Sequence, residues 1–252
     1  MISVYESHET LGSAVAKLFI EKARVAVAER GRFIISLAGG QTPQRIYEML
    51  GKPPYLQQIP WSSIHVFWGD ERYVPASDIR SNQRMARRAF LDLVPIPQEQ
   101  IHPVVCVTNP EEAALAYEKA LASVLSQEDP KLDFTFLGVG TDGHTASLFP
   151  HSAVLHEQER WTSPVYLPDQ ESYRVTLTVP FINQSRTIAF VVTGSNKAEI
   201  VREVLQGPSD HLRLPSQMII PQNGEVRWFL DQEAGRLLQA NESMAKQVPA
   251  SI

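Results

Sequence analysis

Cysteine is almost absent from this chain. Cys106 is the single cysteine among 252 residues, so no disulfide can form within the chain and the composition suits a reducing compartment. We expect Cys106 to be a small buried side chain. The first residues lack the cationic start and apolar core of a signal peptide, and no apolar run approaches the roughly 20 residues that span a bilayer. These absences predict a cytoplasmic protein with no membrane partner.

An excess of positive charge is also absent. Lysine and arginine number 23 against 28 aspartates and glutamates, which gives a formal net charge of −5. This balance argues against a nucleic-acid partner, and an anionic ligand would need a local cluster of cations. The chain has no internal repeat, no low-complexity segment and no linker rich in glycine, serine or proline. We therefore expect one domain spanning residues 1–252.

Apolar strand-like segments alternate with helical ones along the chain. This alternation predicts an α/β fold: a Rossmann-like, mostly parallel sheet with helices on both faces. A loop is expected over 69–75, and Thr42 is expected to cap a helix with Pro43 at its first position. The expected strands are 33–38, 64–68, 132–137, 165–167, 174–179, 187–193, 218–220 and 226–230, and the other expected helices are 9–30, 82–91, 110–125, 194–207 and 232–239.

A glycine-rich turn follows the expected strand 132–137. It reads Gly-Val-Gly-Thr-Asp142-Gly-His144, so a carboxylate and an imidazole lie two residues apart where the backbone turns sharply. Ligands in open α/β sheets bind outside the carboxyl ends of the strands. The turn therefore predicts an enzyme that uses Asp142 and His144 in acid–base chemistry.

The same turn matches G-x-G-x-x-G, a pattern typical of dinucleotide-binding sites. That site needs a helix opening at the third glycine and an acidic residue ending the next strand. Here Pro150 interrupts the helix, and Glu157 and Glu159 fall in an irregular polar stretch, so we predict no nicotinamide or flavin cofactor. A metal site is disfavoured because its candidate ligands show no tight grouping; they are Asp142, His144, His151 and His156.

Two further turns are suited to binding an anion. Residues 38–43 and 194–197 each place free backbone N–H groups at the start of a helix. Lys197 opposes the dipole of its helix, which suggests that an anion lies nearby. Together with the turn at Asp142, they indicate a phosphorylated small molecule. In the loop 69–75, Arg72 could donate to a carbonyl or a phosphate and Asp70 could hold a sugar hydroxyl, although a surface salt-bridged loop remains an alternative.

Seven sequence blocks, spread over nearly the whole chain, occur in the order of one known family. They are Gly39-Gly40-x-Thr42-Pro43, residues 68–75, Asp78-x-x-Ser81-Asn82, residues 138–150, Arg174-x-Thr-x-Thr, residues 192–198 and Leu214-Pro215. With these blocks the chain resembles the 6-phosphogluconolactonases, hydrolases of the pentose phosphate pathway that are related to glucosamine-6-phosphate deaminases. The family's first block usually carries serines where this chain has Ala38 and Gln41, so two hydroxyls are missing from the expected phosphate loop.

The resemblance implies hydrolysis of 6-phospho-D-glucono-1,5-lactone by a monomer that needs no metal or cofactor. His144 would activate water, and Asp142 would orient His144 or face the substrate. Arg72 would stabilise the oxyanion or contact the phosphate, with Asp70 beside it. The phosphate would be bound by Gly39, Gly40, Gln41, Thr42, Arg174 and Lys197.

Two rival activities are weighed against this hypothesis. The related aminosugar-phosphate isomerases carry a glutamate just before the proline that ends the histidine block, and this chain has Phe149 there. We expect the Phe149 ring to pack beneath His144. A sugar-phosphate sensor would be expected to carry an added, basic DNA-binding domain. The sequence shows no basic extension of this kind. Both rivals are disfavoured.

Overall fold

Six parallel strands form the centre of the structure, a computed structural model that describes residues 1–126 and 128–239. The alternating strand–helix order accounts for the parallel arrangement, because each connecting helix carries the chain back to the end of the sheet at which the previous strand began. The fold class expected from the sequence is confirmed. The strands are, in spatial order, β1 (Ile2–Tyr5), β9 (Glu225–Asp231), β8 (Thr187–Val192), β5 (Phe134–Leu137), β2 (Phe33–Leu37) and β3 (Ile64–Trp68).

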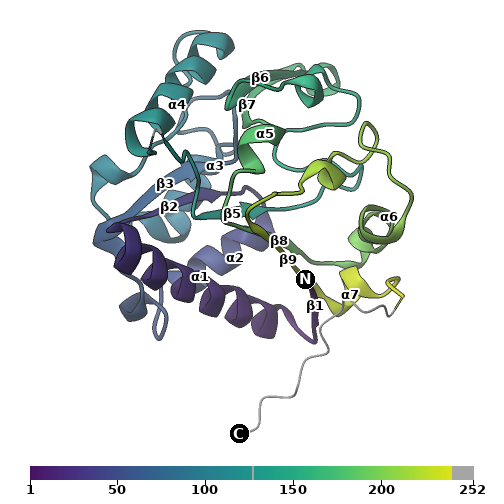
Figure 1. Cartoon of the computed structure of the whole chain (residues 1–252), viewed down its shortest axis with the longest axis horizontal. Helices are drawn as coiled ribbons and strands as arrows, with labels where there is room; N and C mark the ends of the chain where they lie inside the picture. The colour runs from purple at the N-terminus through teal and green to yellow at the C-terminus, as the bar shows by residue number, and fades with distance from the viewer. Residues whose placement is uncertain (127, 240–252) are drawn as a thin grey trace, which may run out of the picture.

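Helices cover both faces of this sheet (Figure 1). Successive side chains of a strand point to opposite faces, so Phe33 and Ile35 join one core and Ile34 joins the other. The inner strands β8, β5 and β2 are buried throughout, as expected for a sheet covered on both sides. One face carries α1 (His8–Arg30) and α2 (Gln41–Leu50), and the other carries α4 (Pro110–Val124), α5 (Val179–Ile182) and α6 (Ala198–Gln206).

A second, three-stranded antiparallel sheet lies beside the first, in the order β4–β7–β6. It is made of β4 (Asp70–Arg72), β7 (Ser172–Leu177) and β6 (Thr162–Leu167). The loop expected over 69–75 is therefore wrong at residues 70–72, which form β4. The strand was missed because its pairing partner, β7, is distant in the sequence. Within this sheet Arg72 lies directly opposite Arg174, which brings two cations to one place.

Several predicted boundaries were wrong. Residues 218–220 are not a strand, because β1, which the sequence analysis missed, pairs with β9 at that edge of the sheet. The helix expected over 82–91 consists of α3 (Asn82–Ala86) followed by a π-helical turn. The last helix, α7 (Gln232–Gly235), ends early at a glycine, a poor helix former. No described helix is long and apolar enough to cross a membrane.

Candidate active site

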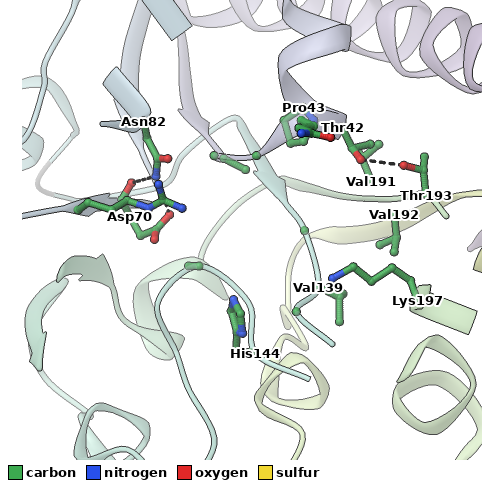
Figure 2. A pocket seen from close by; sticks show the side chains of 18 of the residues that line it. Thr42, Pro43, Asp70, Asn82, Val139, His144, Val191, Val192, Thr193 and Lys197 are labelled. Atoms are coloured by element: carbon green, nitrogen blue, oxygen red, sulfur yellow. Dashed lines mark hydrogen bonds between the residues drawn. The ribbon is translucent and has the colours of Figure 1, made fainter. Parts of the chain in front are cut away.

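A cavity of about 300 Å³ opens at the carboxyl ends of β2, β5 and β8, where three glycine-containing turns meet (Figure 2). The position is the one at which open α/β sheets bind ligands. Asp142 lies outside the lining, behind His144. The residues singled out from the sequence that line the cavity are Gly39, Gly40, Gln41, Thr42, Asp70, Arg72, His144, Arg174 and Lys197.

His144 and Asp142 form a hydrogen-bonded pair at the edge of the cavity. The Nδ1 atom of His144 lies 2.6 Å from Oδ1 of Asp142. Burial raises the pKa of the Asp142 carboxyl, but the hydrogen bonds and charge of His144 outweigh this and leave that pKa below its ordinary value. An ionised carboxylate only accepts hydrogen bonds, so Nδ1 must carry the proton. Nε2, which bonds to no described residue, is then an acceptor when the ring is neutral.

Gly140 makes the close contact between this pair and the turn possible. A Cβ atom built on Gly140 would lie 2.1 Å from Nδ1 of His144 and 2.5 Å from Oδ1 of Asp142. The turn is closed by the Gly140 N–H, which donates to the carbonyl of His144, and by the Thr145 hydroxyl, which donates to the carbonyl of Gly138. Gly140, the second glycine of the pattern noted in the sequence, therefore makes room for the histidine and the aspartate.

Two helix starts and a lysine form one wall of the cavity (Figure 2). Gly40 and Gly194 both have a positive φ, 100° and 98°, which favours glycine at each turn. The expected cap at Thr42 is wrong: α2 begins at Gln41, two residues before the expected Pro43, with Gly40 as its N-cap. The Thr42 hydroxyl instead bonds to that of Thr193 at 2.7 Å. Burial lowers the pKa of Lys197, which favours pairing its charge with an anion.

Asp70 and two arginines form the opposite wall. The Asp70 carboxylate is buried and accepts a hydrogen bond of 2.6 Å from the hydroxyl of Ser147. Nη1 of Arg174 lies 3.7 Å from the same carboxylate oxygen, and Nη1 of Arg72 donates to the carbonyl of Arg80. Asp70 is therefore surrounded by protein groups rather than exposed in a salt-bridged surface loop.

Asn82 lines the cavity although the sequence analysis assigned it no role. Its amide donates to the Asp70 carbonyl at 2.9 Å and to the carboxylate at 3.3 Å. Its Oδ1 lies 2.1 Å from where a Cβ on Gly39 would be, so the glycine permits this approach. The buried Glu71 carboxylate fixes the start of α3 by accepting the N–H groups of Asn82 and Gln83. The Ser81-Asn82 block was the only sequence signal for this contact.

The charges that line the cavity are mostly positive. Arg72, Arg174 and Lys197 face it together with one carboxylate, that of Asp70, in a chain whose formal net charge is −5. Such a local excess of cations suits an anionic ligand. Among residues 1–126 and 128–239, no three histidine, cysteine, aspartate or glutamate side chains are grouped so that they could hold a metal ion.

Comparison with known proteins identifies the family to which the chain is similar. Residues 6–228 match the family described as glucosamine-6-phosphate isomerases/6-phosphogluconolactonase. A 6-phosphogluconolactonase of Synechocystis sp. is 43% identical over 235 residues, covering 88% of this chain and 95% of that protein. One from Nostoc sp. is 44% identical over 222 residues, covering 86% and 90%.

Solved structures agree with the sequence matches. The 6-phosphogluconolactonase of Trypanosoma brucei superimposes with a TM-score of 0.84 at 30% identity, covering 95% of this chain and 98% of that one. A monomeric glucosamine-6-phosphate deaminase, at 20% identity and a TM-score of 0.81, shares the fold. The chain belongs to the glucosamine-6-phosphate isomerase/6-phosphogluconolactonase family.

Proposed function

We propose that this protein hydrolyses 6-phospho-D-glucono-1,5-lactone to 6-phospho-D-gluconate, the second step of the oxidative pentose phosphate pathway. The observation that carries the proposal is the His144–Asp142 pair, whose unbonded Nε2 sits at the edge of a cavity lined by three cations. The relatives named 6-phosphogluconolactonase, at 43% and 44% identity, support this choice of substrate.

The reaction needs one water molecule and one proton shuttle. Nε2 of His144 takes a proton from the water as its oxygen bonds to the lactone carbonyl carbon, and the carbonyl oxygen becomes an oxyanion. When the bond from that carbon to the ring oxygen breaks, the ring oxygen receives the proton from Nε2. Asp142 stabilises the imidazolium through Nδ1, so it acts behind His144 rather than on the substrate.

The positively charged residues of the two walls take the remaining roles, which are phosphate binding and stabilisation of the oxyanion. We assign the phosphate to the wall formed by Lys197 and the turn 39–42, where backbone N–H groups and helix starts favour an anion. We assign Arg174 to the same phosphate, which it approaches from the opposite wall, and Arg72 beside it is the candidate for stabilising the oxyanion. Asp70 keeps Arg174 and Asn82 in place.

A direct assay tests the proposal. Freshly prepared 6-phosphogluconolactone is mixed with the protein, and 6-phosphogluconate is followed through a coupled NADP-dependent dehydrogenase against the spontaneous background. We expect a rate proportional to enzyme concentration, and little activity on unphosphorylated gluconolactone. A rate no faster than the background, with the folded protein at micromolar concentration, would overturn the proposal.

We also propose that residues 1–252 act as one monomeric domain in the cytoplasm. Cys106 is a free thiol, which suits a reducing compartment and supports the cytoplasmic assignment. Sedimentation equilibrium across a range of concentrations tests the monomer, and fractionation of the native cells tests the compartment. A stable dimer, or protein recovered mainly with an organelle or membrane, would contradict the respective part.

A further inference from the structure

Two buried tyrosines make the same unusual contact at two different strand ends. The hydroxyl of Tyr47 accepts the N–H of Ala38 at 2.9 Å and donates to the carbonyl of Ala38 at 3.0 Å. The hydroxyl of Tyr117 accepts the N–H of Trp68 at 2.6 Å and donates to its carbonyl at 2.9 Å. In each case one phenol satisfies both backbone groups of a single residue, as the opposing residue of a neighbouring strand would.

Both contacts lie where the sheet itself offers no partner. Ala38 comes directly after the last residue of β2, and Trp68 ends β3, which is the last strand in the spatial order of the sheet. Buried backbone N–H and C=O groups need hydrogen bonds. The two phenols supply them from opposite faces, since Tyr47 belongs to α2 and Tyr117 to α4 (Figure 1).

The two residues held in this way lead into the walls of the active site. Ala38 is followed at once by Gly39 and Gly40 of the anion-binding turn, and Trp68 is followed, after one glycine, by Asp70. Each tyrosine is almost wholly buried, with 0% and 3% of its surface exposed, so neither touches a substrate. Burial also raises the pKa of both phenols, which keeps them protonated and able to donate.

We propose that Tyr47 and Tyr117 are positioning residues for the reaction, each fixing the exit of one strand so that one wall of the cavity keeps its geometry. Tyr47 fixes the turn that receives the phosphate, and Tyr117 fixes the wall of Asp70 and Arg72. This inference rests on the proposed hydrolysis of the phosphorylated lactone.

Tyrosine-to-phenylalanine variants test the inference because they remove the hydroxyl and keep the ring. The matched control is Tyr55→Phe, which removes a hydroxyl that joins a turn to Ser13 of α1, away from the cavity. We expect Tyr47→Phe to raise KM for the phosphorylated lactone about 3- to 30-fold, less than the roughly 100-fold loss that a misplacement of about 1 Å can cause. It should leave the slow hydrolysis of unphosphorylated gluconolactone nearly unchanged. Tyr117→Phe should lower kcat/KM on both substrates.

A merely structural role would lower Tm without this division between substrates. Kinetics are therefore measured at a temperature where circular dichroism shows every variant folded. If Tyr47→Phe and Tyr117→Phe match Tyr55→Phe in KM and kcat on both substrates, the inference is overturned.

Amide hydrogen exchange provides a readout that does not depend on activity. In the unaltered protein the amides of Ala38 and Trp68 should exchange as slowly as those of the central strands, and each phenylalanine variant should speed exchange only at its own strand exit. Fast exchange at both amides in the unaltered protein would overturn the inference even if a variant failed to fold. Slow exchange in a protein without lactonase activity would overturn the proposed function and leave the two tyrosines as strand anchors only.

Discussion

The ring of Phe149 packs against the imidazole of His144, with the two ring centroids 4.2 Å apart and the planes tilted by 32°. This confirms the packing expected from the sequence. The guanidinium of Arg174 lies 5.9 Å from the centroid of the same ring, so Phe149 lies close both to the proposed base and to a cation of the opposite wall. An apolar ring thus fills the place where the related isomerases are expected to carry a glutamate.

The first prediction follows from this contact. The related isomerases are expected to need a carboxylate at the place of Phe149 for ring opening; here His144 bonds to Asp142, but Phe149 supplies no second carboxylate. The protein should therefore release no ammonia and no fructose 6-phosphate from glucosamine 6-phosphate. Both products are followed enzymatically, with a true deaminase as the positive control. Deamination at a rate comparable to lactone hydrolysis would reverse the choice between the two activities.

His144→Ala should lower kcat for the phosphorylated lactone by at least about 100-fold, the lower end of what a positioned general base contributes. KM should change little, because the phosphate contacts remain. His156→Ala, which removes an exposed histidine, is the matched control. Steady-state kinetics of the purified variants measure both constants, and near-normal kcat in His144→Ala would refute its role as the base.

Lys197→Ala should raise KM for the phosphorylated lactone about 10- to 100-fold, the range expected when a charged hydrogen bond is lost. Its effect on unphosphorylated gluconolactone should be slight, since that substrate has no phosphate to bind. Lys17→Ala on the exposed side of α1 serves as the control for the change in net charge. Equal losses on both substrates would mean that Lys197 supports the structure instead.

Protein stability should fall as the pH is lowered from about 6.5 toward 4, and His102 should contribute to this fall. Burial, with the charge of the neighbouring His65, lowers the pKa of His102 from 6.5 to about 4. Between these values the unfolded chain binds a proton that the folded protein excludes, so acid favours unfolding. Urea titrations at several pH values should show a weaker pH dependence in His102→Gln than in His156→Gln. Identical slopes would contradict this assignment.

The sequence predicted the chemistry of single turns better than the way in which they meet. Asp142, His144, Gly39 and Gly40 lie in the turns that follow β5 and β2, so local pattern and the rule for ligand sites in parallel sheets suffice to place them together. Asn82 could not be placed, because its role depends on α3 folding back over β4.

Contacts between distant segments account for most of the remaining errors. The antiparallel pairing of β4 with β7 joins segments far apart in the chain, and three residues are too few to show an alternating pattern. The hydroxyl pair of Thr42 and Thr193 also depends on the three-dimensional fold. For Thr42, the preference of threonine for the N-cap predicted the wrong helix boundary, since Gly40 alone suits the positive φ at that turn.

Gly140→Ala should abolish most of the activity while leaving the fold intact. Its new methyl group would lie within 2.5 Å of the Asp142 carboxylate and even closer to the His144 ring, so both side chains must move. Because the contacting atoms are side-chain ends rather than backbone, they can move aside. We therefore expect the substitution to disturb the geometry of the site more than the stability of the fold. The control is Gly138→Ala, which also adds a methyl group to the cavity lining but meets no protein atom within 4 Å, so it reports the effect of the added volume alone. Kinetics and thermal melts of the two variants should differ strongly in kcat and little in Tm. Equal kcat values would show that the His144–Asp142 pair tolerates displacement, and the proposed proton shuttle would then lose its geometric basis.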